Sequence, residues 1–208
     1  MQNLKKIKKL RSITGVSIMA CQKAIIKSKG RLNLAINFLI NNSNNIKTNS
    51  LKESFIICRR NKKKNKAVGM LIATETDFVT KNDIFKKLAN IILDVALFAK
   101  KKQDILKYQI LNKLPLFKIV NYFSNNIFNE YIELKTIVFI EAPFVNFYIH
   151  HSCNKAALIG FSNYIPNLEQ ISKNIAIQLV CNTNYNTSFP KLLLYKNIKL
   201  VNYKVLSL

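Results

Sequence analysis

The chain contains few of the residues from which chemical and nucleotide-binding sites are built. Its 208 residues include four glycines, two histidines, ten acidic residues and no tryptophan. No stretch matches G-x-x-x-x-G-K-S/T, the glycine-rich loop that holds nucleotide phosphates. No Ser-His-Asp or Cys-His motif stands out, and a catalytic carboxylate pair has few candidates. We therefore expect a protein that is not an enzyme and that uses no cofactor.

The cysteines and histidines give little support for a disulfide framework or a metal site. The cysteines lie far apart and form no C-x-x-C pair. His150-His151 is the only histidine cluster, and Cys153 alone is weak additional support for a metal there. We expect small buried thiols in a reducing compartment, no metal, and a structural or partner-contacting role for the histidines. The four cysteines are Cys21, Cys58, Cys153 and Cys181.

Long apolar segments are also absent. No stretch approaches the ~18–20 uninterrupted apolar residues of a membrane-spanning helix, and the N-terminus lacks the apolar region of a secretory signal. Because 49% of the residues are hydrophobic, the chain can still bury a core, as one large domain or two small ones. We expect a cytoplasmic protein that does not associate with membranes.

The net charge of +23 has two explanations that the composition leaves open. One is binding to a polyanion such as RNA. The other is the mutational bias of an A/T-rich genome, because the 29 lysines, 27 asparagines and 28 isoleucines share A/T-rich codons. Only four residues are arginine, the side chain that phosphate and base readers favour. We favour mutational bias, and we expect some non-specific RNA affinity in either case.

Helical spacing predicts a compact three-helix bundle at residues 1–41. The first helix should end at Thr14-Gly15, Ser17 can cap the second, and Gly30 fits the position after its end. The expected core positions are Leu4, Ile7, Leu10, Ile18, Cys21, Ala24, Ile25, Leu32, Leu34, Ala35, Phe38 and Leu39.

A polar linker is predicted at residues 42–52, so the bundle should share few contacts with the chain that follows. Residues 53–208 favour an α+β core with an antiparallel sheet and flanking helices. A basic run at 59–66 could bind phosphates, but we favour a hairpin loop whose charges face water. The expected strands are 54–58, 67–74, 131–141, 144–151, 156–161 and about 198–206, and helices are expected from about 82, within 103–127 and near 168–180.

Two separated blocks resemble the elongation factor Ts family. Residues 10–24 read L-R-S-I-T-G-V-S-I-M-A-C-Q-K-A, similar to the family's L-R-x-x-T-G turn and the following helix M-x-C-K-K-A-L. Residues 75–82 read E-T-D-F-V-T-K-N, close to the family's E-T-D-F-V-A-K-N. The order and spacing of the blocks also resemble the family. A weaker third block, Tyr148-Ile149-His150 followed by Ala157–Gly160, is similar to its Y-I-H-G hairpin.

The resemblance implies a guanine-nucleotide exchange factor that binds elongation factor Tu and promotes GDP release. Its fold would combine an N-terminal bundle like a ubiquitin-associated (UBA) domain with a dimerisation-type core. Because the resemblance thins after about residue 182, we expect the family's coiled-coil protrusion to be deleted, the closing strand to be retained, and the protein to be a monomer. The contact residues that it implies are Thr76, Asp77, Phe78, Val79, Arg11, Val16, Ile18, Met19, Phe128 and His150.

Asp77-Phe78 is the most specific of these expectations. An exposed phenylalanine beside an aspartate, on a loop before a helix, would bring an apolar wedge and a negative charge to the partner's Mg²⁺ and phosphate site. Ile18 and Met19 suit the bundle core equally well by spacing alone. Two other functions stay open: a basic RNA-binding protein that uses Lys62–Lys66 and Lys5–Lys9, and a non-catalytic adaptor that leaves GDP release unchanged.

Overall fold

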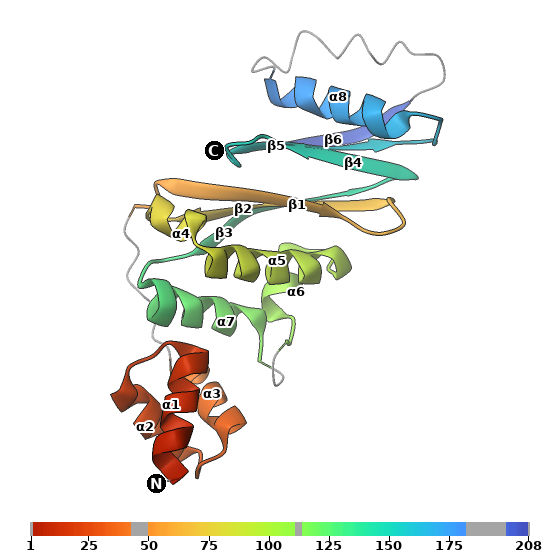
Figure 1. Ribbon diagram of the computed structural model, residues 1–208. Helices are drawn as coiled ribbons and strands as arrows, with labels where there is room; N and C mark the ends of the chain where they lie inside the picture. The colour runs from red at the N-terminus through yellow and green to blue at the C-terminus, as the bar shows by residue number, and fades with distance from the viewer. Residues whose placement is uncertain (1, 43–49, 111–113, 182–198, 208) are drawn as a thin grey trace. The chain divides into compact units, whose positions relative to one another are not determined.

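The computed structural model describes residues 2–42, 50–110, 114–181 and 199–207 (Figure 1). Its contacts divide the chain into two compact units. The helical unit comprises Met1–Leu51 and Gln103–Ile132, and the α+β unit comprises Lys52–Lys102 and Glu133–Leu208. The predicted α+β class is confirmed. Within the described ranges, every helix is too short or too polar to cross a membrane.

The first three helices of the helical unit lie where the sequence predicts them. Gly15 ends α1 with a φ of +70°, a left-handed conformation that glycine adopts without strain. The Ser17 hydroxyl caps α2 by accepting a hydrogen bond from the Ala20 N–H at 3.3 Å. After the other end of α2, the Gly30 N–H donates to the Ile25 carbonyl at 2.9 Å. These helices are α1 (Gln2–Thr14), α2 (Ile18–Lys27) and α3 (Leu32–Asn41).

Three predicted core positions of the bundle are exposed. Leu4 is 62% exposed, Ile18 is 54% exposed and Leu34 is 47% exposed. Each stands at the edge of its helix's buried face, roughly a quarter of a turn away from the residues that pack inside. The buried face of each helix is therefore narrower than the spacing of its apolar residues suggests.

The second segment of the helical unit packs against the first. Leu114 and Tyr122 join the same hydrophobic core as Leu10, and the Tyr122 hydroxyl donates to the Thr14 carbonyl at 2.7 Å. The expectation of few contacts between the bundle and the later chain is wrong. The composition of the linker does not indicate which distant helices pack together. The added elements are α6 (Lys102–Lys107), α7 (Leu116–Phe123) and the π-helical turn η2 (Ser124–Phe128).

Most of the predicted linker at 42–52 lies outside the described residues. The division into a bundle at 1–41 and a core at 53–208 stays a prediction, although the contacts group 103–132 with the helices and not with the core.

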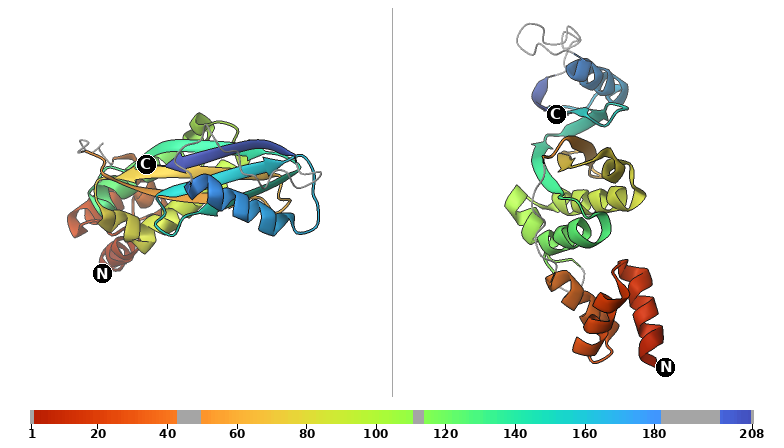
Figure 2. Two further views of the ribbon diagram at one scale, coloured as in Figure 1. Left: turned by 90° about the horizontal axis from the view of Figure 1, so that it is seen from above. Right: turned by 90° about the vertical axis from the view of Figure 1, so that its left-hand side faces the viewer.

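The α+β unit contains two three-stranded antiparallel sheets. Helix α5 covers the outer face of the β1–β2–β3 sheet, and α8 covers the outer face of the β4–β5–β6 sheet (Figures 1 and 2). All six strands lie close to their predicted ranges. The elements are β1 (Glu53–Arg60), β2 (Lys66–Thr74), α4 (Asp77–Lys81), α5 (Asp83–Phe98), β3 (Glu133–Glu141), β4 (Phe144–Ile149), β5 (Lys155–Phe161), α8 (Leu168–Cys181) and β6 (Leu200–Ser207).

The last strand joins a sheet, as the sequence predicts. Strand β6 runs antiparallel to β5, with Leu206 opposite Ala156 and Tyr203 opposite Ile159. Leu206 is buried against the other sheet, so β6 contributes to the core. The predicted deletion of a coiled-coil protrusion concerns residues 182–198, which lie outside the described part of the chain.

Two glycines let the inner faces of the sheets approach each other. A Cβ added to Gly69 of β2 would lie 2.8 Å from the Cδ1 atoms of Leu158 and Leu206. A Cβ added to Gly160 of β5 would lie 2.9 Å from the Cβ of Ala142. These distances are shorter than van der Waals contact, so any larger residue would force the sheets or their side chains to move.

The prediction of four buried thiols is correct for two of them. Cys21 and Cys58 are buried, Cys153 in the β4–β5 turn is half-buried, and Cys181 at the end of α8 is exposed. Burial, with a smaller contribution from Cys153, raises the pKa of the Cys58 thiol to about 12. Cys58 is therefore protonated and unreactive at neutral pH.

Tyr122→Phe should destabilise the helical unit. The variant leaves the buried Thr14 carbonyl without its side-chain donor, so we expect the free energy of unfolding to fall by about 1 kcal/mol. Urea denaturation followed by circular dichroism measures the change. Tyr108→Phe alters a tyrosine of the same unit that is 48% exposed, and should change stability by less than about 0.5 kcal/mol. Equal losses in both variants would show that the hydrogen bond does not contribute.

Gly69→Ala should destabilise the α+β unit. The new methyl group would overlap the Leu158 and Leu206 side chains, and such overpacking costs about 1–3 kcal/mol. Thermal denaturation should show a lower midpoint than that of the unmodified protein. An unchanged midpoint would mean that the two sheets adjust without cost and that their contact does not constrain the fold.

Candidate functional site

The E-T-D-F-V block begins directly after the end of β2 at Thr74 and runs into the short helix α4. The expectation that Asp77-Phe78 lies on a loop is wrong, because these two residues begin this helix. The Thr80 hydroxyl donates to the Asp77 carbonyl at 2.9 Å, and the Lys81 ammonium pairs with the Asp77 carboxylate one turn earlier. These contacts help to hold a helix that is too short to form on its own.

Helix α4 directs Phe78 toward solvent and Val79 toward the core. The Phe78 side chain is 80% exposed, whereas Val79 is 4% exposed. Thr76 is half-buried at the position before the helix. Burial of Val79 fixes the helix to the unit, and it leaves the Phe78 ring available for a partner to bury. The predicted exposure of Phe78 is confirmed, and its role stays a prediction.

Lys81 balances the charge of Asp77. The hydrogen bond from Lys81 and its charge hold the pKa of Asp77 below its ordinary value, and Asp77 raises the pKa of Lys81 in return. The tip of α4 therefore presents an apolar ring beside an ion pair and not beside an uncompensated negative charge. The D-x-x-x-K spacing indicates this pair, but the prediction for Asp77-Phe78 did not include Lys81.

Four segments of the α+β unit meet around Asp77. The start of β1, α4, the start of α5 and the turn between β4 and β5 line an open pocket of about 400 Å³. The Ile56 N–H donates to the Cys153 carbonyl at 2.8 Å and so ties this turn to β1. The structure thus places the turn that carries His150 beside the predicted wedge. The polar lining residues are Glu53, Ser54, Asp77, Thr80, Lys81, Lys86, Ser152 and Asn154.

His150 is a half-buried residue at the start of the β4–β5 turn. The Tyr148 hydroxyl lies 3.5 Å from its Nδ1 atom, and the centroid of the His151 ring lies 4.1 Å from that of His150. Among the described residues, no group of three His, Cys, Asp or Glu side chains could hold a metal ion. The expected contact of His150 with a partner stays a prediction.

Three of the predicted contact residues are exposed on the helical unit. Met19 is 74% exposed, Ile18 is 54% exposed, and Arg11 is exposed as well. Ile18 and Met19 are therefore not part of the bundle core. Ile26 was not among the predicted contact residues. It is 65% exposed and lines a shallow groove with Met19. Its signal is the seven-residue spacing from Met19, which places both on one side of α2.

Val16 and Phe128 are less exposed to solvent than the other predicted contact residues of the helical unit. Val16 is buried in the core of the helical unit, so its part in any contact would be to support its exposed neighbours. Phe128 is half-buried at the end of η2, and its ring centroid lies 6.3 Å from that of Phe123.

The basic run at 59–66 is not a loop whose charges all face water. Arg59 pairs with Asp94 of α5. Lys66 donates to the Ala99 carbonyl at 3.0 Å and pairs with Glu141 at 3.1 Å. These acceptors come from segments far along the chain, so the local run of like charges could not reveal them.

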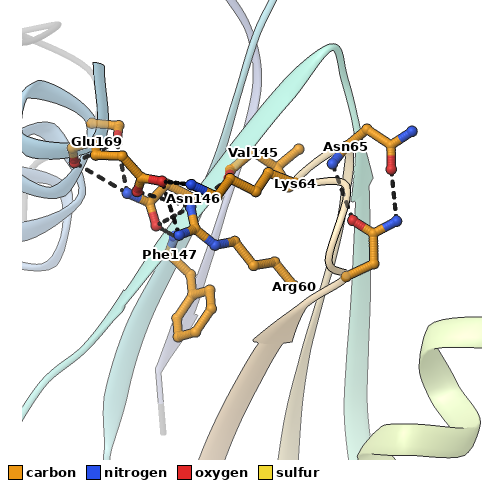
Figure 3. Close-up of polar contacts among 9 residues, drawn as sticks. Arg60, Lys64, Asn65, Val145, Asn146, Phe147 and Glu169 are labelled. Atoms are coloured by element: carbon orange, nitrogen blue, oxygen red, sulfur yellow. Dashed lines mark hydrogen bonds and ion pairs between the residues drawn. The ribbon is translucent and has the colours of Figure 1, made fainter. Parts of the chain in front are cut away.

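Arg60 is the centre of a polar network between the β1–β2 hairpin and α8 (Figure 3). Its guanidinium donates to both carboxylate oxygens of Glu169, at 3.0 and 3.1 Å, and to the Asn146 Oδ1 at 3.2 Å. Lys64 also pairs with Glu169. The Asn146 amide donates to the Ser172 hydroxyl at 2.7 Å. The network joins elements of both sheets and restrains their relative position.

Four of the six basic side chains in this run therefore have acceptors within the α+β unit. Lys62 and Lys63, at the hairpin tip, are exposed. The run holds the unit together, and its paired side chains have little capacity left for phosphates.

Comparison with known proteins gives a family match that starts at the E-T-D-F-V block. The family model described as Elongation factor TS matches residues 75–190 and begins at this block. The chain belongs to the elongation factor Ts family. It is 31% identical to elongation factor Ts of Christiangramia forsetii over 176 residues, and 30% identical to that of Flavobacterium psychrophilum over 176 residues.

These matches cover 83% of the chain but 64% of each relative. Elongation factor Ts of Wigglesworthia glossinidia brevipalpis is 30% identical over 198 residues, which cover 92% of the chain and 66% of that relative. The chain thus spans less than two thirds of the length of the first two family members.

Glu169→Gln should weaken the Arg60 network and change the acid sensitivity of the protein. Partial burial alone would raise the pKa of Glu169, but the hydrogen bonds and charges of Arg60 and Lys64 hold it below its ordinary value. Such a carboxylate stabilises the fold above its unfolded pKa of about 4.3, and this contribution is lost as the pH falls through the folded value.

We expect Glu169→Gln to lower the free energy of unfolding at neutral pH by about 1 kcal/mol, a modest loss because the carboxylate is 38% exposed and screened. Below about pH 4 the difference from the unmodified protein should shrink. Urea denaturation at both pH values measures it. The control is Asp83→Asn, which alters an 89% exposed carboxylate. A difference that does not depend on pH would contradict the assignment.

Proposed function

We propose that this chain binds elongation factor Tu and promotes GDP release during translation. The observation that carries the proposal is Phe78, whose ring is 80% exposed at the start of α4 and within the block where the family match begins. A large apolar side chain gains little by facing water. Its position in the family's most distinctive block supports a partner that buries it.

The mechanism that we propose is a wedge. Guanine nucleotides are held by a Mg²⁺ ion and by backbone N–H groups around the phosphates. An exchange factor must bind the nucleotide-free partner more tightly than the loaded one. Burial of Phe78 contributes ~1.5–3 kcal/mol. If the ring inserts beside the Mg²⁺ site, this free energy would lower the partner's affinity for the nucleotide. The Asp77–Lys81 pair would supply polar contacts at the rim of the insertion.

The exposed surface of the helical unit would provide a second point of contact. Ile18, Met19 and Ile26 present apolar area, and Arg11 adds a charged donor. Two contact sites in one chain raise the effective concentration of the second once the first has bound. In this proposal the chain acts as a cytoplasmic monomer, forms no covalent bond and needs no cofactor.

Phe78→Ala should slow stimulated GDP release by at least tenfold, because the loss of a central aromatic anchor typically costs ≥2 kcal/mol. Stopped-flow fluorescence of labelled GDP leaving elongation factor Tu measures the rate. Phe98→Ala is the matched control, since Phe98 is also 80% exposed in the same unit. We expect that variant to behave like the unmodified protein.

Circular dichroism should show both variants folded. Equal effects of Phe78→Ala and Phe98→Ala, or none from either, would contradict the wedge. If the unmodified protein binds elongation factor Tu but leaves the rate of GDP release unchanged, the adaptor function is the correct one.

A further inference from the structure

The cations of the helical unit differ in arrangement from those of the α+β unit. Residues 1–42 contain nine basic residues and no acidic residue. In the α+β unit, Arg59, Arg60, Lys64, Lys66 and Lys81 all have acidic partners. Mutational bias would explain the number of lysines, but it does not explain the absence of acidic residues from α1–α3.

Three lysines form a row on the solvent side of α1. Lys5, Lys8 and Lys9 are spaced by three and four residues, so they lie on one face of the helix. All three are exposed, whereas Leu10 and Thr14, on the other side, are buried. No acidic residue of the described chain pairs with any of the three. Like charges at this spacing repel each other and destabilise the helix, and a bound polyanion would remove this repulsion.

We propose that this lysine row on α1 binds the phosphate backbone of RNA. The ammonium groups are point charges suited to phosphate oxygens, and they repeat along about 6 Å of helix axis. Helix α1 carries no aromatic residue on which bases could stack, so the binding does not depend on base sequence. The choice of RNA among polyanions rests on the proposed role in translation. The inference that the lysine row binds a polyanion does not depend on that role.

A membrane surface fits α1 less well. An interfacial helix needs one continuous apolar face. The exposed apolar residues of α1 include Leu4 and Ile13, which are nine residues and therefore about 2.5 turns apart. They point to opposite sides of the helix and cannot enter one surface together. Lys5, Lys8 and Lys9 occupy the face between them.

Fluorescence anisotropy with a labelled uridine oligonucleotide of about 20 nucleotides tests the proposal. The full chain is titrated without elongation factor Tu, so that failure here is distinct from failure of nucleotide exchange. The triple variant K5Q/K8Q/K9Q removes the row. The control K62Q/K63Q/K204Q removes the same charge from three exposed lysines of the α+β unit. Circular dichroism confirms that both variants keep their helices.

We expect K5Q/K8Q/K9Q to weaken RNA binding at least tenfold at about 50 mM salt. The slope of log affinity against log salt should become less negative by about 2, because each lost phosphate contact with a single strand removes about 0.7. The control should keep most of its affinity. Equal losses in the two variants would show that net charge alone matters, and would overturn the proposal. So would a larger loss of binding to phosphatidylserine vesicles than to RNA.

Discussion

The close contact between the two sheets constrains the rest of the α+β unit. A Cβ added to Gly69 would lie 2.8 Å from atoms of the opposite sheet, and one added to Gly160 would lie 3.0 Å from the Cγ2 of Ile140 in β3. Burial and dispersion supply the attraction across this contact. Because the sheets are so near, the Arg60 guanidinium reaches Glu169 and the Ile56 N–H reaches the Cys153 carbonyl. The β4–β5 turn is thus held beside α4 by packing that lies far from Phe78 in the sequence.

Basic side chains have two different environments in this chain. In the α+β unit they cross-link segments, and the bidentate Arg60–Glu169 pair joins residues 109 positions apart. In α1, Lys5, Lys8 and Lys9 face water, and none of them pairs with an acidic residue among those that the structure describes. A pair that is partly shielded from solvent gains more from its geometry than an exposed pair does. The same residue type therefore acts as an internal restraint in one unit and remains available to external anions in the other.

The elements were predictable where their signal is local. The six strands follow from apolar runs between polar turns, and the caps at Ser17 and Gly30 follow from their own residue types. Helix α4 was missed because five residues, two of them β-branched, give no helical period. The contact of Tyr122 with Thr14 joins residues 108 positions apart, and no composition or spacing records it. The exposure of Phe78 was predictable from the polar residues that precede it. The position of the β4–β5 turn beside α4 was not predictable, because the two segments are far apart in the sequence.

A wedge is more effective when it is ordered before it binds. If Phe78 stood on a free loop, fixing each residue of that loop would cost about 1–2 kcal/mol, comparable with the ~1.5–3 kcal/mol that burial of the ring contributes. Helix α4 is already held by the burial of Val79, by the Thr80 hydroxyl and by the Asp77–Lys81 pair. Most of the energy from burying the ring would then remain to act on the partner. The helix that replaces the expected loop therefore strengthens the case for a wedge.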